Sequence, residues 1–265
     1  MEIDIFEVFA AISENPPLVH HITNWVTIYD CAQICRCAGA LPVMAHAKEE
    51  AGDMTNVANA IVLNIGTLTP ELVDAMILAG EVANKNGIPV VLDAVGAGAT
   101  PLRTDSCRKI LDKIKVDVIK GNLGEIATLS GLGGKVRGVE SVGADAKGTT
   151  IAESLAKKEN ATVVITGGVD VISDGKRTFE VANGTPMMSK VVGTGCMAGT
   201  LIGAFCAVEK DYTKAATCAL SCYGIAGELA ARKSSSPMEF KTQLFDSLFS
   251  LNKDCGIEPK IKQVR

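Results

Sequence analysis

Short apolar runs alternate with longer amphipathic stretches through the middle of the chain. Four runs are rich in Val, Ile and Leu, as buried strands are: 60–66, 89–95, 117–122 and 161–168. Between them, apolar positions recur at helical spacing over 70–87, 104–114, 123–131 and 150–160. Because helical crossovers cover both faces of a parallel sheet, its strands are apolar throughout. The pattern therefore predicts an α/β protein with a mostly parallel central sheet and helices on both faces.

The helix boundaries follow from their end residues. Gly87 is expected to end the helix over 70–87, since glycine suits the left-handed conformation of a C-cap. Thr104 and Asp105 are the candidate N-caps of the next helix.

The alternation changes after residue 168. Two β-rich runs within 169–184 flank Asp174–Gly175, a pair that favours a type I′ hairpin, so the sheet is predicted to end in an antiparallel edge hairpin. Apolar helices are predicted over 193–210 and 214–233. A last helix is predicted to pack on the core through residues at helical spacing: Phe240, Leu244, Phe245, Leu248 and Phe249. The Gly-rich stretch 131–148 is predicted to be a mobile loop. With no internal repeat, we expect a single domain over 1–265.

Composition narrows the class of protein. The 265 residues carry 26 Lys+Arg and 30 Asp+Glu, a formal charge of −4, which gives no basic footprint for nucleic acid. No apolar run reaches the roughly 18 residues that span a membrane. The first residues lack the basic segment of a signal peptide. These features predict a cytoplasmic protein without nucleic-acid or membrane partners.

Nine cysteines are scattered along the chain, an odd count that suits reduced thiols in a cytoplasmic protein. Cys31, Cys35 and Cys37 resemble a metal cluster, but no second Cys/His pair follows at zinc spacing. Cys31 and Cys35 fall on one apolar helical face instead, so we expect core packing for them.

Ligand-type residues gather at the predicted carboxyl ends of the strands. In open α/β sheets this edge is where ligands bind. The candidates are Asn64, Gly66, Asp93, Gly96, Gly98, Lys120, Asn122, Glu125, Thr166, Gly167 and Gly168. Asp93 and Glu125 form the best acidic pair for a hydrated Mg²⁺, which needs one or two carboxylates plus substrate phosphates. For Glu125 a plain helix-capping role is an equal alternative.

The sharpest local feature is Gly193-Thr194-Gly195-Cys196, which opens a predicted helix. Unpaired N–H groups at a helix start bind anions, and glycines let the anion approach, so this turn suits a phosphoryl group. The helix dipole favours the thiolate of Cys196. A Gly-rich turn with a buried thiol is the alternative interpretation.

The missing motifs restrict the chemistry. Gly133-Gly134-Lys135 is followed by Val136, so no P-loop is present, and no G-x-G-x-x-G follows a strand. The nucleophile elbow G-x-S-x-G of α/β-hydrolases is also absent. A phosphotransferase without a Walker motif fits what remains.

Seven segments together resemble the hydroxyethylthiazole kinase family of the ribokinase-like superfamily, in order and at comparable spacing. They run from about residue 14 to the final helix: 19–27, 39–50, 64–69, 90–100, 118–126, 164–175 and 191–205. MAHAKEE (44–50) and GTGCMAG (193–199) are the most specific of these matches. The resemblance implies a three-layer ribokinase-like fold with the antiparallel edge hairpin. It also implies ATP-dependent phosphorylation of the primary alcohol of 5-(2-hydroxyethyl)-4-methylthiazole, in thiamine salvage, with Mg²⁺.

The same resemblance implies roles for individual residues. Cys196 falls where most superfamily members carry a catalytic Asp, and Gly193, Thr194 and Gly195 fall in the anion hole. Met44, Asn24 and Gly193 match substrate positions. Lys120, Thr166 and Asn122 match nucleotide positions, whereas Asp93 and Glu125 match the magnesium network. A homotrimer with active sites between subunits is implied, in which Met44 serves a neighbour's site.

Ala94 departs from the family pattern, because it replaces the proline usual in that segment, but it removes no ligand. Two other functions are weighed against the thiazole kinase. A non-catalytic nucleotide or thiazole sensor need not keep Asp93, Glu125 and Gly193–Cys196, which are useful mainly in a transition state. A kinase for the pyrimidine half of thiamine, or for another small alcohol, is less favoured by Met44 and by the thiol at 196.

Overall fold

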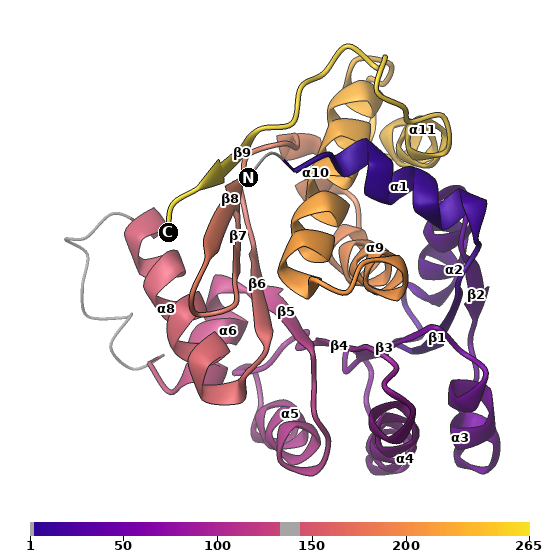
Figure 1. Cartoon of the computed structure of the whole chain (residues 1–265), viewed down its shortest axis with the longest axis vertical. Helices are drawn as coiled ribbons and strands as arrows, with labels where there is room; N and C mark the ends of the chain where they lie inside the picture. The colour runs from indigo at the N-terminus through magenta and orange to yellow at the C-terminus, as the bar shows by residue number, and fades with distance from the viewer. Residues whose placement is uncertain (1–2, 133–143) are drawn as a thin grey trace.

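The computed structural model describes residues 3–132 and 144–265, with side chains from 148 in the second part. Its centre is one sheet in the order β2-β1-β3-β4-β5-β6-β7-β8-β9 (Figure 1). Strands β1 to β6 pair in parallel, and β7, β8 and β9 continue the sheet antiparallel. The strands are β1 Leu18–Ile22, β2 Leu41–Val43, β3 Ala60–Asn64, β4 Val90–Asp93, β5 Val118–Asn122, β6 Thr162–Thr166, β7 Asp170–Ser173, β8 Thr178–Val181 and β9 Ile261–Gln263.

Helices cover both faces of the sheet, as predicted (Figure 1). One face carries α3 Lys48–Asn56, α4 Pro70–Asn86, α5 Pro101–Lys113, α6 Leu123–Ser130 and α8 Ala144–Glu159. The other carries α1 Ile5–Glu14, α2 Ile28–Cys37, α9 Thr194–Val208, α10 Tyr212–Ala231 and α11 Pro237–Phe249, with the short 3₁₀ turn η1 Pro186–Lys190 nearby. No helix among the described residues is long and apolar enough to cross a membrane.

Two apolar cores lie between the sheet and its helices. Successive side chains along a strand point to opposite faces, so Ile61 and Leu63 pack against the α4 side while Val62 packs against α9. Because both faces are buried, the strand needs an unbroken apolar run. The predicted strands within 60–66, 89–95, 117–122 and 161–168 are thereby confirmed.

The helix caps confirm one prediction and correct another. Gly87 ends α4 in the left-handed conformation, with φ +67°. The next helix begins three residues earlier than expected: Thr100 is its N-cap and its hydroxyl accepts from Arg103 N. Pro101 occupies the first helical position, where its fixed φ suits a helix and its missing N–H costs nothing. The prediction of Thr104 or Asp105 as the cap is therefore wrong.

The antiparallel hairpin is present, but its turn is not type I′. Ser173 pairs with Thr178 and Asp174 N donates to Arg177 O at 3.2 Å, so Gly175 and Lys176 form the turn instead of Asp174 and Gly175, and only Gly175 has a positive φ. The Asp174 carboxylate also accepts from the backbone N–H groups of Lys176 and Arg177 at 2.8 and 2.7 Å, and these side-chain bonds brace the turn.

Two further expectations meet different outcomes. On α11, Phe240, Leu244 and Leu248 are buried, but Phe249 is 75% exposed, so its predicted core role is wrong. The helix turns Phe249 one position past the buried stripe. Most of the predicted mobile loop 131–148 lies outside the described residues, and α8 already includes its last residues from Ala144.

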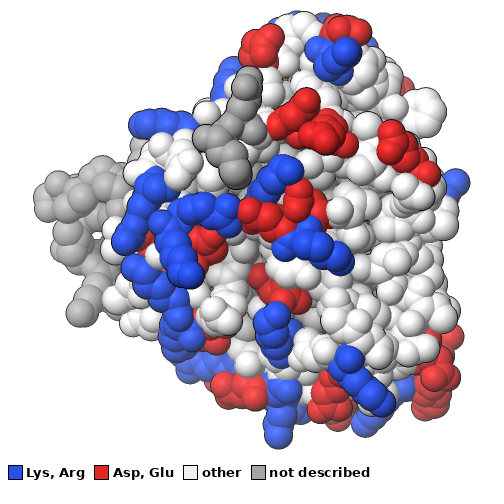
Figure 2. Space-filling model, in the orientation of Figure 1, with Lys and Arg blue, Asp and Glu red and all other residues white. Residues whose placement is uncertain are grey.

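Charged side chains are unevenly spread over the face drawn in Figure 2. Lys, Arg, Asp and Glu gather on the side where α8 and the antiparallel strands lie, and they are sparse on the side of α2 and β2.

Candidate active site

The parallel register brings the predicted strand-end residues together at one edge of the sheet. Asn64 lies opposite Asp93, and Asp93 lies opposite Lys120. On the next pair of strands, Asn122 lies opposite Thr166. Residues that are far apart in the sequence are thus neighbours because each one ends its own strand.

Asp93 and Lys120 form a buried ion pair. Lys120 Nζ lies 3.1 Å from Asp93 Oδ1 and 3.2 Å from Oδ2. Burial raises the pKa of Asp93 to about 6, although the charge of Lys120 opposes this. Burial alone would lower the pKa of Lys120, but Asp93, Cys196 and Glu125 together outweigh it and hold that pKa above its usual value. Near neutral pH both groups are charged, so the site holds a fixed ammonium at the edge of the sheet.

The start of α9 lies directly over this pair. Gly193 is the N-cap with φ +96°, and no side chain caps the helix, which leaves the first N–H groups available. A Cβ on Gly193 would lie 2.8 Å from Thr27 Cγ2, and one on Gly195 would lie 3.3 Å from Lys120 Nζ. Glycine at 193 therefore lets the turn lie close to Thr27, and glycine at 195 lets it lie close to the Lys120 ammonium.

Beyond its first turn, α9 also lies close to the sheet. Gly195, Gly199 and Gly203 recur every four residues, which places them on one face of the helix. A Cβ would lie 3.2 Å from Asp93 Oδ2 at Gly199 and 2.4 Å from Val62 Cγ2 at Gly203. We call these three residues the glycine face of α9; it allows the helix to rest on β3, β4 and β5.

Cys196 joins the group through Asn24. The thiol is partly buried in the first turn of α9, and Asn24 Nδ2 lies 3.4 Å from its sulfur. The hydroxyl of Thr194 points instead to the carbonyls of Met188 and Val191, at 3.1 and 3.4 Å. Thr194 thus shapes the turn with its side chain.

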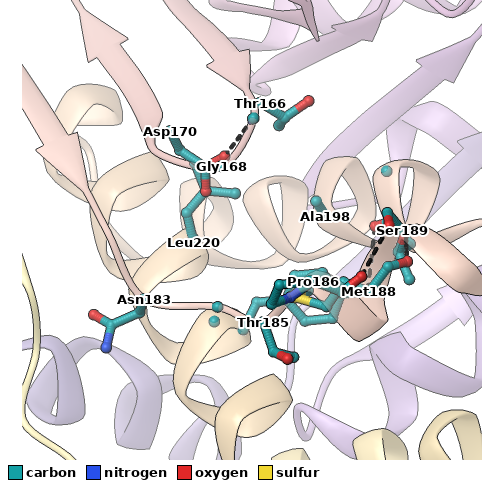
Figure 3. Close-up of a pocket in the computed structure, with 16 residues that line it drawn as sticks. Thr166, Gly168, Asp170, Asn183, Thr185, Pro186, Met188, Ser189, Ala198 and Leu220 are labelled. Atoms are coloured by element: carbon teal, nitrogen blue, oxygen red, sulfur yellow. Dashed lines mark hydrogen bonds between the residues drawn. The ribbon is translucent and has the colours of Figure 1, made fainter. Parts of the chain in front are cut away.

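A cavity of about 570 Å³ opens beside the helix start. Its wall includes Thr166, Thr194 and Gly195 from the predicted site. Figure 3 shows Thr166 and Asp170 at one end of the cavity and Thr185, Pro186 and Met188 at the other. A volume of this size is in the range of cofactor and nucleotide sites.

Sequence reasoning missed Asp170, the carboxyl group in the wall of this cavity. It accepts a hydrogen bond from Gly167 N at 2.9 Å, and burial raises its pKa to about 7. The signal was its place directly after Thr166-Gly167-Gly168 and Val169, at the beginning of β7. Tyr223 and Gly224 of α10 also line the cavity and were not anticipated.

Glu125 is a capping residue. Asn122 and Glu125 form a reciprocal capping box: Asn122 N donates to Glu125 Oε2 at 2.7 Å, and Glu125 N donates to Asn122 Oδ1 at 3.0 Å. Its other oxygen accepts from Gly96 N at 2.7 Å, which ties α6 to the loop after β4. Glu125 thus caps the helix, and its carboxylate is fixed near Asp93, whose pKa its charge helps to raise.

Met44 lies apart from this group. It follows β2, the edge strand, and β1 and β3 separate it from Asp93 on β4. The part of the chain that the structure describes holds no cluster of three or more His, Cys, Asp or Glu side chains suited to a metal. Cys31 and Cys35 are buried thiols on α2, as expected.

Comparisons with known proteins identify the family. A family model described as "Hydroxyethylthiazole kinase family" matches residues 9–254. A hydroxyethylthiazole kinase of Methanosarcina mazei is 56% identical over 241 residues, which cover 91% of this chain and 92% of the relative. A solved structure of the hydroxyethylthiazole kinase protein from Pyrococcus horikoshii OT3 is 42% identical with a TM-score of 0.91, covering 98% of this chain and 99% of that one.

The chain belongs to the hydroxyethylthiazole kinase family. It is therefore an enzyme of the kinase class, and the three-layer ribokinase-like fold expected from the sequence is confirmed. A pyridoxal kinase from Staphylococcus aureus, solved in complex with ADP, shares this fold with a TM-score of 0.62, at 18% identity and over 81% of this chain and 89% of that one. At that identity the likeness concerns the fold alone.

The departure at Ala94 has a structural consequence in this hydroxyethylthiazole kinase family member. Ala94 N donates to Lys120 O at 2.9 Å, which extends the pairing of β4 with β5 by one bond. A proline has no N–H to donate. The alanine thus adds backbone support beside the Asp93–Lys120 pair and removes no side chain from the site.

Proposed function

We propose that the protein phosphorylates the primary alcohol of 5-(2-hydroxyethyl)-4-methylthiazole with ATP, as a step of thiamine salvage. The observation that carries the proposal is the position of Cys196 and its uncapped helix start directly over the Asp93–Lys120 pair. Family membership supports the choice of reaction and of acceptor.

The nucleotide is assigned to the cavity beside α9. We infer that the adenosine part occupies the space between Thr166 and Met188, and that the phosphates extend toward Lys120 and Asn122. The ammonium of Lys120 is the cation at this edge of the sheet that meets the first turn of α9. Phosphate at a helix start beside a fixed ammonium is electrostatically favourable.

Phosphoryl transfer asks a protein mainly for positioning and for neutralisation of charge. The N–H groups of Gly193 to Cys196 face the site without a capping side chain, so they are preorganised donors for the migrating group. Cys196 would accept or polarise the proton of the attacking hydroxyl. Because proton transfer from the alcohol needs little help in a loose transition state, a thiol suffices at this position.

Mg²⁺ is the metal that this donor set fits. Asp93 and Glu125 are two neighbouring carboxylates whose oxygens already accept from protein N–H groups and from Lys120. Such carboxylates would hold a hydrated ion through its waters, and Mg²⁺ keeps its waters readily. When bound, the ion supplies positive charge to the ATP phosphates.

For the acceptor site we propose Asn24 and Gly193 from one subunit and Met44 from its neighbour, in a homotrimer. Apolar side chains on the segment after β1 are exposed: Trp25 by 57%, Val26 by 67% and Tyr29 by 74%. Trp25 packs only on His46, at a centroid distance of 4.6 Å, among the described rings. This surface adjoins the segment of Met44, because His46, on which Trp25 packs, lies two residues after Met44.

We also infer a cytoplasmic location and no nucleic-acid or membrane partner. The cysteines among the described residues are all free thiols, as expected for a reducing compartment. The formal charge of −4 gives no attraction to polyanions.

The test is ATP consumption coupled to phosphorylation of hydroxyethylthiazole, with and without Mg²⁺. We expect Mg²⁺-dependent product from the wild type and none from Gly193→Val, whose side chain would collide with Thr27. Cys196→Asp should retain or exceed wild-type turnover, and Cys196→Ser should retain a measurable part of it, because positioning supplies most of the rate. A folded wild type that binds ATP but makes no product would refute the assignment; preference for an aminopyrimidine alcohol would replace the acceptor.

A further inference from the structure

An unbroken chain of side-chain hydrogen bonds connects the two ends of the site. It begins at Lys120, which donates to Asp93. Asn64 Nδ2 donates to Asp93 Oδ2 at 2.9 Å, and Asn24 Nδ2 donates to Asn64 Oδ1 at 3.0 Å. Asn24 Nδ2 also lies 3.4 Å from Cys196 Sγ. The first four residues are buried and Cys196 alone is partly exposed, so the chain passes under the site from the nucleotide end to the acceptor end.

The orientation of the Asn24 amide is fixed by its oxygen. Oδ1 accepts from Val26 N at 3.1 Å, from Thr27 N at 3.0 Å and from Thr27 Oγ1 at 3.1 Å. An amide oxygen accepts and its nitrogen donates. Since Oδ1 faces these donors, the NH₂ group must face Asn64 and the sulfur of Cys196.

The orientation of the Asn64 amide is fixed from the other side. A carboxylate can only accept, so the nitrogen of Asn64 must face Asp93. Its oxygen then faces Asn24, and it also accepts from Gly66 N at 2.9 Å. Gly66 leaves room for this arrangement, because a Cβ there would lie 2.8 Å from Asn24 Cβ. The parallel register of β3 with β4 places Asn64 opposite Asp93 in the first place.

We propose that Asn64 and Asn24 are positioning residues that form a relay. The Asp93 carboxylate at the nucleotide end orients the Asn64 amide, and the Asn64 amide orients the Asn24 amide so that its N–H group points at the Cys196 sulfur at the acceptor end. An N–H donated to sulfur favours the thiolate, the reactive form. The proposal rests on the proposed function only in naming Cys196 as the acceptor-side group. Under this proposal Asn24 orients a donor toward the Cys196 sulfur in addition to contacting substrate, and Asn64 holds Asn24 in that orientation.

The relay is tested by the rate at which iodoacetamide alkylates each thiol of the full-length protein at one fixed pH, followed by peptide mass spectrometry. Asn24→Asp keeps the accepting oxygen but replaces the donor, and Asn64→Leu removes the middle group while keeping a branched side chain with the same number of heavy atoms. We expect alkylation of Cys196 to slow about tenfold in both, the size of one hydrogen bond to a charged group.

The matched control is Asn59→Leu, the same substitution just before the opposite end of β3, where Asn59 Oδ1 accepts from Leu18 N. It should leave the Cys196 rate unchanged. The partly exposed thiols Cys37 and Cys255 serve as internal references in every variant, and continued protection of the buried thiols Cys31 and Cys206 shows that the fold is retained.

Three outcomes would overturn the relay. One is a Cys196 rate within about twofold of wild type in both folded variants, since loss of a donor must change it. Another is an equal change at Cys37 and Cys255, which would indicate general loosening. The third is exposure of Cys31 and Cys206 in both variants, which would make the network a structural clamp only. Alkylation needs no substrate, so failure of the kinase assay would leave this result readable on its own.

Discussion

Asp170 shows how burial can make one side chain sensitive to pH. Its pKa is raised to about 7 by burial, far above the value of a carboxyl in the unfolded chain. Between those two values the folded protein binds a proton that the unfolded chain has released. Stability from this group is therefore greatest at low pH and falls as the pH rises toward 7.

We predict that Asp170→Asn removes this dependence. The amide oxygen can still accept from Gly167 N, and the group no longer ionises. Between pH 5 and pH 8 the wild type should lose about 2 kcal/mol of unfolding free energy relative to the variant. Urea unfolding of both proteins across this range measures the difference. A constant difference would show that Asp170 ionises normally in the folded state.

At the scale of elements, Arg103 fastens two loops of the site to α5. Its Nη1 donates to Ile65 O at 3.1 Å and to Val95 O at 3.0 Å, and its Nη2 donates to Gly66 O at 2.7 Å. Ile65 and Gly66 follow β3, and Val95 follows β4. The planar guanidinium, with several donors in a fixed geometry, is what such a three-point attachment requires.

We predict that Arg103→Ala lowers the melting temperature by several degrees, as expected for the loss of about 2 kcal/mol from charge-assisted hydrogen bonds. kcat/KM should fall about tenfold, because displaced loops misplace Asn64 and Asp93. Arg103→Lys keeps the charge but not the fork, so it should recover little. Lys113→Ala, at an exposed position on the same helix, is the control. Wild-type kinetics in Arg103→Ala would contradict this role.

At the scale of the whole molecule, the exposed segment after β1 bears on assembly. If it lies in a trimer interface, Tyr29→Glu places a charge in a desolvated contact and should shift the protein from trimer to monomer, because burying an unpaired charge is costly. Light scattering coupled to size-exclusion chromatography measures the mass. Loss of activity should accompany loss of the trimer. Val57→Glu is a control on an exposed apolar residue at the end of α3; an active monomeric wild type would refute the shared site.

The sequence predicted the elements that depend on local pattern. Strands β3, β4, β5 and β6 were visible because each is buried on both faces and needs a continuous apolar run, whereas β1, with His20 and His21 in its middle, was not predicted. The edge strands β2 and β9 have only three residues each, too short for any periodicity, and they exist because a neighbouring strand offers free hydrogen bonds. The geometry of the hairpin turn was also not predicted, because hydrogen bonds to the Asp174 side chain help to set it.

The sequence predicted which residues lie at the strand ends of the site, but it predicted fewer of the contacts among them. Asp93 and Lys120 could be expected at one edge, because parallel strands end together. Their burial as an ion pair depends on how closely α9 approaches the sheet. The four-residue spacing of the glycines indicates a close approach, but the distance is set by tertiary packing. Asp170 was missed because it joins the wall of a cavity that α10, far away in the sequence, helps to enclose (Figure 3).

The glycine face of α9 also bears on the order of events during folding. Each of its contacts joins this helix to a strand from much earlier in the chain, and such non-local contacts are slow to form. The final position of the helix depends on Val62, Asp93 and Lys120 lying in register, since it rests on all three. We infer that the start of α9 reaches its final position late in folding, so a half-folded chain has a sheet but lacks the arrangement that we propose for phosphoryl transfer.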